Sequence, residues 1–224
     1  QKITGLLNAI AFPAFSHAHS HSSLEKVREY LLTSTRMLGI AAFPVFFGMA
    51  ATADSIVAVL LGEKWLPAAP LLQLLALAMP LRLLGNVFPP LLWGMGRPRI
   101  SASNYLLAAL LMPLAFYVGA RWGMLGLAMA WLGMYPLVFV VTAWRSCRQV
   151  EIGLATYASA LLRPLIAALG MLVLVMQLAP WLPGASGGWL HLGAQILLGV
   201  AVYGAGMLII DRRGLAETLY LIRS

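Results

Sequence analysis

An arginine lies near the middle of a long apolar stretch of this chain. Residues 68–93 are mostly apolar and are long enough to cross a bilayer, which takes a helix of ~20 residues. Arg82 and Asn86 interrupt this apolar stretch. An arginine at bilayer depth costs about 2.5–3.5 kcal/mol, so it usually faces protein or water rather than lipid. Asn86 follows four residues later and would share its helical face. We expect this pair to line a cavity and bind an anionic head group; the alternative is a structural charge bonded to helix carbonyls or to another span.

Four more polar side chains lie within or near apolar runs. Gln73 and Asn104 are further candidates for substrate binding, although Asn104 lies nearer a span end and has an interfacial alternative. Arg163 is a candidate for contact with lipid head groups, which a long basic side chain reaches by snorkelling. Asp54 is the candidate for coupling to a proton or cation; its alternative is a place near the outer interface, within reach of water or Lys64.

The sequence predicts no enzyme. It contains no phosphate-binding loop, no CxxC, no HExxH and no GxSxG pattern. No catalytic residue and no cofactor is therefore expected. His17 and His21 have the spacing of two zinc ligands on one helix face, but no third ligand lies near them, and we expect a solvated loop and no metal site. Cys147 is expected to be a plain thiol, with palmitoylation as the alternative.

The composition is that of a membrane protein. The chain has 224 residues, of which 61% are hydrophobic and 10% are charged, with a mean hydropathy of +0.87. Soluble domains carry about 25% charged residues. The apolar runs are continuous rather than alternating, which predicts helices and not barrel strands. The net charge of +8 arises from basic residues at the ends of apolar runs, so we expect no nucleic-acid partner.

The predicted fold is all-α, a polytopic membrane helix bundle with six full transmembrane helices and a partial N-terminal helix. Residues 1–16 would be the tail of a truncated transmembrane helix, 17–36 a cytoplasmic loop with a short amphipathic helix on the membrane, 37–210 the six-helix domain, and 211–224 a cytoplasmic tail. The spans are predicted at residues 37–61, 68–93, 101–120, 123–143, 157–178 and 190–210. Small residues at Gly126, Ala130 and Gly133 would allow close helix contact.

Basic residues predict the orientation, because cytoplasmic loops are enriched in lysine and arginine. With six spans, most of them fall on the side of the first loop: Lys26, Arg28, Arg36, Arg97, Arg99, Arg145, Arg148, Arg212, Arg213 and Arg223. Only Lys2, Lys64 and Arg121 fall on the other side. The first loop and the C-terminus are therefore predicted to be cytoplasmic. Tryptophans near the span ends fit an interfacial belt: Trp65, Trp93, Trp122, Trp144, Trp181 and Trp189.

Several short motifs, in this order and spacing, resemble a known family. They are FPAFS at 12–16, LLGEKW at 60–65, AAPLLQLLAL at 68–77, PLR at 80–82 and GRPR at 96–99. This pattern resembles bacterial polysaccharide-biosynthesis flippases of the Wzx type, in the branch of the colanic acid exporter within the MOP superfamily. The resemblance covers most of residues 4–150. It implies the carboxy-terminal half of a two-halved flippase, so a central cavity would have only one wall here.

The resemblance implies transport of an undecaprenyl-diphosphate-linked oligosaccharide across the bacterial inner membrane by alternating access, for exopolysaccharide, O-antigen or capsule synthesis. Implied partners are the lipid-linked oligosaccharide, membrane lipids, and the polysaccharide polymerase and chain-length machinery. It supplies no residue-by-residue binding motif. The alternatives are a drug/cation antiporter of the same superfamily, a membrane polymerase or ligase of envelope synthesis, and a non-transporting assembly subunit.

Overall fold

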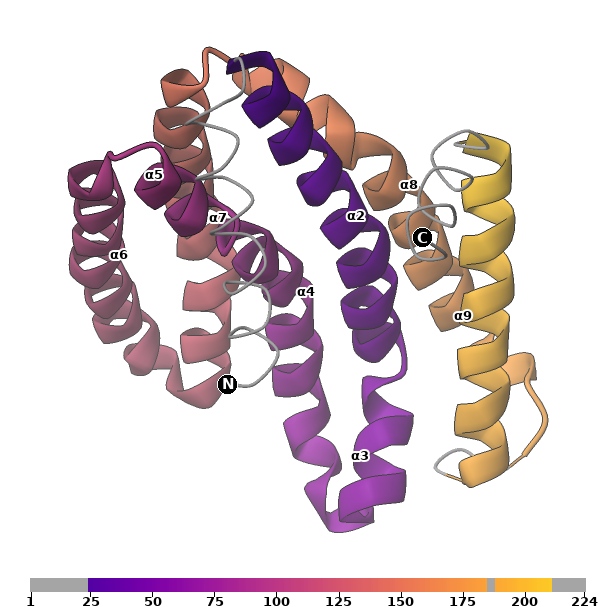
Figure 1. The fold of residues 1–224 in the computed structure, drawn as a ribbon. Helices are drawn as coiled ribbons and strands as arrows, with labels where there is room; N and C mark the ends of the chain where they lie inside the picture. Colours follow the sequence, from indigo (N-terminus) through magenta and orange to yellow (C-terminus); the bar gives the residue numbers. More distant parts are fainter. Residues whose placement is uncertain (1–23, 185–187, 211–224) are drawn as a thin grey trace. The chain divides into compact units, whose positions relative to one another are not determined.

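A computed structural model describes residues 24–184 and 188–210, and all regular structure in these ranges is helical (Figure 1). This confirms the predicted all-α membrane bundle. The α-helices are α2 (Leu24–Ala51), α3 (Ala53–Leu61), α4 (Ala69–Gly85), α5 (Phe88–Gly94), α6 (Pro98–Gly119), α7 (Gly123–Gln149), α8 (Leu154–Leu178) and α9 (Trp189–Ile210). Short 3-10 helices are η1 (Glu63–Ala68), η2 (Ala120–Trp122) and η3 (Ala179–Trp181). The segments predicted at 1–16 and 211–224 lie outside the described residues.

Five helical stretches of the described chain are long and apolar enough to cross a membrane. They are Leu24–Ala51, Glu63–Gly94, Pro98–Gln149, Leu154–Trp181 and Trp189–Ile210. The third stretch has 52 residues, far more than the ~20 that one crossing needs. It consists of α6, η2 and α7, which fold back on each other as a hairpin. Counted as two crossings, it brings the five stretches to the six predicted spans.

Helix α2 differs from the expectation of a separate amphipathic helix before the first span. It runs from Leu24 to Ala51 without a break at Met37, because no proline or glycine precedes Gly39 in it to end the helix. Val27 and Leu31, four residues apart, are 1% and 0% exposed, so this part of α2 already packs against protein. The division at residues 36 and 37 into loop and membrane domain stays a prediction.

The chain divides into two compact units, whose boundaries fall within α2, α4 and α8. Among the described residues, one unit combines 24–38 with Leu81–Leu161. The other combines Gly39–Pro80 with 162–184 and 188–210. The first unit is centred on three aromatic rings, since Phe88 lies 6.1 Å from Phe139 and 5.6 Å from Tyr157 between ring centroids. These rings join α5, α7 and the start of α8.

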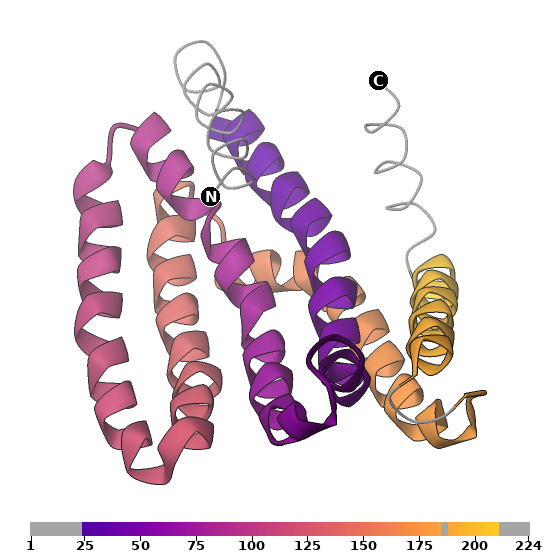
Figure 2. The ribbon, with the colours of Figure 1, turned by 90° about the horizontal axis from the view of Figure 1, so that it is seen from below.

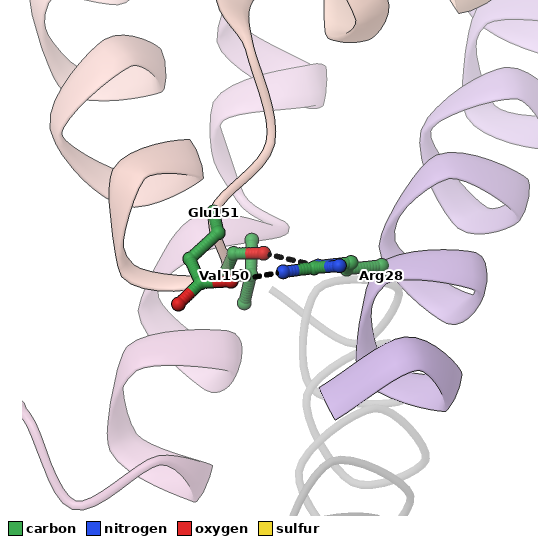
Figure 3. Close-up of polar contacts among 3 residues, drawn as sticks. All are labelled: Arg28, Val150 and Glu151. Carbon is green, nitrogen blue, oxygen red and sulfur yellow. Dashed lines mark hydrogen bonds and ion pairs between the residues drawn. The ribbon is translucent and has the colours of Figure 1, made fainter. Parts of the chain in front are cut away.

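Arg28 ties the start of α2 to the end of α7 in the first unit (Figure 3). Its Nε donates to the carbonyl oxygen of Val150 at 2.6 Å, and its guanidinium forms an ion pair with Glu151. Glu151 has a φ of 53°, the left-handed conformation in which a helix commonly ends. The N–H of Ile152 reaches back to the Cys147 carbonyl at 3.0 Å. Arg28 therefore contacts both the backbone and the side chain of this helix end.

Helices α6 and α7 lie side by side and meet most closely next to their turn (Figures 1 and 2). A Cβ added to Gly126 would overlap the carbonyl oxygen of Gly119, and one added to Gly119 would lie 3.3 Å from the Ala130 Cβ. The predicted role of small residues is thus confirmed at Gly126 and Ala130. It is wrong at Gly133, which has no neighbour within 4 Å of an added Cβ and is exposed.

Small residues and a hydrogen bond between α9 and α2 help to hold the second unit together. Met171 of α8 lies against Gly48 of α2 and Gly199 of α9, with atoms 3.7 and 3.6 Å from the Cβ positions of the two glycines. Tyr203 of α9 donates its hydroxyl to the Ile40 carbonyl of α2 at 2.9 Å. These contacts join α2, α8 and α9 within this unit.

Candidate functional site

A break in the second predicted span lies next to its polar residues. Helix α4 ends at Gly85 and α5 begins at Phe88, with 3-10-type bonds from Asn86 N–H to Leu83 and from Val87 N–H to Leu84. The prolines at 89 and 90 cause the break, because they have no N–H to donate to the carbonyls of Gly85 and Asn86, four residues earlier. Irregular backbone at membrane depth is tolerated where it lines a cavity or is buried in protein.

Arg82, one turn before this break, stacks on a tryptophan of α7. Its Cζ lies 5.1 Å from the ring centroid of Trp131. That ring is 5.4 Å from Tyr135 and 5.9 Å from Phe116, so the cation faces an aromatic cluster. The guanidinium donates no hydrogen bond to another described residue, and the side chain is exposed. The cation–π contact engages the guanidinium face and leaves its N–H edges available to an anion.

A small polar cavity lies beside the break, between α5, α6 and α7. Its volume is about 100 Å³. The polar residues that line it are Asn86, Ser101, Asn104, Tyr105, Tyr135 and Thr142. The lining also includes the rings of Phe88 and Phe139 but no acidic or basic residue. Its walls can therefore donate and accept hydrogen bonds without carrying a formal charge.

Two residues of the cavity wall are deeply buried. Ser101 is 2% exposed and Asn104 is 7% exposed. The Ser101 hydroxyl and both polar atoms of the Asn104 amide have no hydrogen-bond partner among the described residues. Most buried polar atoms in proteins do have a partner. These three atoms are hence available to a group that enters the cavity.

Arg82 and the cavity adjoin each other at α4 and α7. Gly85, which lines the cavity, lies against Tyr135, whose hydroxyl is 3.2 Å from the position of an added Cβ. Tyr135 in turn follows Trp131 by one helical turn. Of the predicted binding residues, the structure thus brings together Arg82, Asn86 and Asn104 in one unit.

The other predicted residues belong to the second unit. Gln73 makes only a weak contact in the described chain, from its Nε2 to the Met176 sulfur at 4.0 Å. Asp54 is exposed in the first turn of α3, where the helix dipole favours a carboxylate. Arg163 is exposed on α8. None of these three residues lines the cavity, and their roles stay predictions.

The residues considered for metal binding and for lipid modification lie only partly within the described chain. Among the described residues, no three histidine, cysteine or acidic side chains lie together as metal ligands would. His17 and His21 lie outside the described residues. Cys147 is a buried free thiol at 0% exposure, which disfavours its modification by palmitate in this conformation.

Sequence reasoning missed several residues of the site. Ser101 follows the helix start by three residues and lies three before Asn104, which puts both on one face of α6. Trp131 was also missed, although it is the tryptophan that lies away from the predicted span ends. In the second unit, the buried pair His191 and Gln195 was overlooked; their Nε2 atoms are 3.4 Å apart.

The chain is similar to proteins of polysaccharide biosynthesis. Residues 1–70 match the family model described as polysaccharide biosynthesis protein. The chain is 28% identical over 184 residues to the teichuronic acid biosynthesis protein TuaB of Bacillus subtilis (strain 168), covering 80% of this chain and 37% of TuaB. It is 30% identical over 132 residues to the lipopolysaccharide biosynthesis protein WzxC of Escherichia coli (strain K12), covering 58% of this chain and 26% of WzxC.

A third relative matches over the whole chain. The succinoglycan biosynthesis transport protein ExoT of Rhizobium meliloti (strain 1021) is 29% identical over 229 residues, which are 100% of this chain and 45% of ExoT. The chain is thus similar to curated proteins of polysaccharide biosynthesis and transport. It spans less than half the length of these three curated relatives. No solved structure matches the chain.

Proposed function

We propose that this chain forms part of a flippase that carries an undecaprenyl-diphosphate-linked oligosaccharide across the bacterial inner membrane by alternating access. The names of its relatives, which include biosynthesis of teichuronic acid and of lipopolysaccharide and transport in succinoglycan biosynthesis, support the substrate class. The observation that carries the proposal is Arg82, stacked on Trp131 beside a polar cavity and a helix break.

Arg82 has the chemistry that a diphosphate requires. A diphosphate loses its water when it enters a bundle, and charge-assisted hydrogen bonds from a planar guanidinium replace that water better than a point charge does. The Trp131 ring holds one face of the guanidinium, so the N–H groups at its edge remain free to donate to phosphate oxygens. Asn86, one turn later and exposed, adds an amide donor. The polyprenyl tail would stay in lipid.

The remaining assignments complete the proposed transport cycle. Discontinuous helices at membrane depth recur at substrate sites of transporters that work by alternating access, and the break between α4 and α5 is such a place. Gln73 would add a polar contact, Asp54 would bind a coupling ion, and Arg163 would contact lipid head groups. The C-terminus would be cytoplasmic, and polymerase and chain-length proteins would be partners in the same pathway.

The cavity gives less support to the alternative functions. A drug/cation antiporter needs carboxylates in its cavity to hold a cation, and the lining residues include no acid. A polymerase or ligase needs grouped catalytic side chains, and the proposed site offers a single arginine with amides, hydroxyls and aromatic rings. We therefore propose that this site binds the lipid-linked substrate, which is then carried across the membrane without chemical change.

Substitution of Arg82 tests the proposal. In the full-length protein, Arg82→Ala should lower polysaccharide export about 10-fold or more, because a hydrogen-bonded charge contributes ~1.5–3 kcal/mol. Arg82→Lys should retain part of the export, since it keeps the charge and loses the planar fork. Trp131→Leu should also lower export, because it removes the surface that holds the guanidinium.

Trp144→Leu is the matched control, since Arg148 stacks on Trp144 at the same 5.1 Å outside the proposed site. It should leave export unchanged. Export is measured as secreted polysaccharide at equal amounts of protein in the membrane. Normal export by Arg82→Ala under these conditions would remove Arg82 from the binding role.

A further inference from the structure

The polar cavity holds more hydrogen-bonding capacity than its own walls use. The Asn104 amide presents a donor and an acceptor, and the Ser101 hydroxyl can serve as either. All three atoms lack a partner among the described residues, in side chains that are 93% and 98% buried by their exposures of 7% and 2%. Burial of such groups without partners is unfavourable. A ligand that satisfies them would recover this loss.

The charge and shape of the cavity restrict that ligand. No acidic or basic residue lines it, so a buried charge would find no counter-ion there. Phe88 and Phe139 provide apolar walls beside the amide and the hydroxyl. A group with polar edges and apolar C–H faces matches this lining, and a neutral sugar is such a group. A carboxylate or a phosphate is not.

The size of the cavity limits how much of the ligand it can hold. Pockets for drug-sized molecules measure about 300–1,000 Å³, whereas this cavity measures about 100 Å³. It therefore has room for one substituent and the adjoining part of a sugar ring, and not for a whole oligosaccharide. Asn86 and Tyr105 of its lining are exposed, so the cavity is reached from the surface of its unit.

The position of the cavity relative to Arg82 indicates which sugar would enter. Arg82 lies in the last turn of α4, and Asn86 is the first residue after the end of that helix. Asn86 belongs to the cavity wall, while Arg82 stacks on Trp131 one turn from the lining residue Tyr135. A diphosphate held by Arg82 would place its first attached group at the mouth of the cavity.

We propose that this cavity is a subsite for the neutral sugar attached directly to the diphosphate of the transported lipid, with Asn104 and Ser101 binding its hydroxyl or acetamido group. The proposal rests on the function proposed above and adds a selectivity to it. Arg82 would bind every diphosphate lipid, and the subsite would favour those whose first sugar is uncharged.

Binding to four lipids tests the proposal. The full-length protein in lipid nanodiscs is titrated with undecaprenyl diphosphate, alone or bearing glucose, N-acetylglucosamine or glucuronic acid. The protein should bind the glucose or the N-acetylglucosamine lipid about 10-fold more tightly than the bare lipid, as two or three neutral hydrogen bonds would provide. Glucuronic acid should add nothing. The two neutral sugars distinguish a hydroxyl-binding from an acetamido-binding subsite.

Substitutions then separate the subsite from the arginine. Asn104→Leu and Ser101→Ala should abolish the gain from the neutral sugar and leave the affinity for the bare lipid unchanged. Arg82→Gln should weaken binding of all four lipids about 10-fold. It should keep the roughly 10-fold tighter binding of the neutral-sugar lipids relative to the bare lipid. Ser103→Ala is the control, because Ser103 lies on the same helix but its hydroxyl donates to the Ile100 carbonyl and accepts from Arg145.

Each failure has a separate meaning. Equal affinity of the unsubstituted protein for bare and neutral-sugar lipids overturns the subsite, and this result needs no variant to fold. A gain that persists in Asn104→Leu also overturns it, and the cavity would then serve only the packing of α5, α6 and α7. If Arg82→Gln binds bare undecaprenyl diphosphate normally, the role proposed above for Arg82 is wrong. The comparison of bare and sugar-bearing lipids in the unsubstituted protein still tests the subsite.

Discussion

Glu151 combines an unfavourable backbone conformation with a favourable side-chain contact. Its φ of 53° is a conformation that costs residues with a Cβ about 1–2 kcal/mol and that glycine adopts freely. Its carboxylate pairs with Arg28 (Figure 3). The Glu151 side chain is 72% exposed, and exposed ion pairs contribute only ~0.2–1 kcal/mol. The backbone term should therefore dominate at this position.

Two substitutions of Glu151 should have different effects on thermal stability. Glu151→Ala loses the ion pair and keeps the strained φ, so its melting temperature should fall by a few degrees at most. Glu151→Gly loses the same pair but relieves the backbone, so it should melt at a higher temperature than Glu151→Ala and near the unsubstituted protein. The measurement is thermal unfolding of the purified protein in detergent.

Glu29→Ala is the control for charge removal, because Glu29 is an exposed acid one residue from Arg28 on α2. It should not shift the melting temperature. Equal melting temperatures for Glu151→Ala and Glu151→Gly would contradict this prediction. They would show that the left-handed conformation of Glu151 does not lower the stability of the protein and that only loss of the ion pair does.

At this scale the sequence indicates which polar residues interrupt apolar helices, but not which residues surround them. The positions of Arg82, Asn86 and Asn104 follow from the cost of polar groups in apolar helices, which sequence alone exposes. Trp131, Tyr135 and Ser101 are different, since their types are common in membrane helices. Only tertiary packing of α4 on α7, and of α5 on α6, makes them the surroundings of Arg82 and Asn104.

Among the elements, the α6–α7 hairpin depends on two glycines that face each other. Gly119 and Gly126 lie so close that a side chain on either would overlap the backbone of the other. In lipid, helices associate by close packing and not by the hydrophobic effect. The close approach therefore replaces the energy that apolar burial would provide in water.

Gly126→Ala should destabilise the protein by about 1–3 kcal/mol, as overpacking does. Its methyl group would meet the Gly119 carbonyl, and the backbone would have to separate. Gly133→Ala on the same helix is the matched control, because nothing lies within 4 Å of its added Cβ. It should be neutral or stabilise the helix by up to ~1 kcal/mol. Thermal or denaturant unfolding in detergent measures both.

Sequence-based prediction of these elements was limited by what periodicity alone can resolve. The small residues of α7 suggested close contact, but spacing could not tell that Gly126 faces α6 while Gly133 is exposed. The break between α4 and α5 had a local cause in Pro89 and Pro90, yet hydropathy treats both helices as one run. A helix break leaves the apolar content of a span unchanged, which is why hydropathy does not detect it.

For the whole molecule, composition predicted the class and charge predicted the topology. Depletion of charge over the full length predicted a membrane protein, continuous apolar runs predicted helices, and the described helices agree. The orientation of the spans is a different property, because lysine and arginine near the span ends determine it and helix packing does not. Exposed residues at the two ends of one span allow the predicted orientation to be measured directly.

Lys64 and Arg99 are exposed and lie at opposite ends of the span formed by α4 and α5. In a full-length protein freed of other cysteines, with Cys147→Ala removing the one cysteine of the given chain, Lys64→Cys should react with a membrane-impermeant maleimide in intact spheroplasts. Arg99→Cys should react only after the membrane is permeabilised, because GRPR is predicted to be cytoplasmic.

The reverse labelling pattern would mean that every span of the chain has the opposite orientation. Arg82 would then keep its depth, since it lies near the middle of its span, but the start of α6 and its Ser101–Asn104 cavity would face the periplasmic half of the membrane. The sugar subsite would in that case receive its ligand from the side on which the lipid is released, so this labelling pattern also decides where in the cycle the subsite acts.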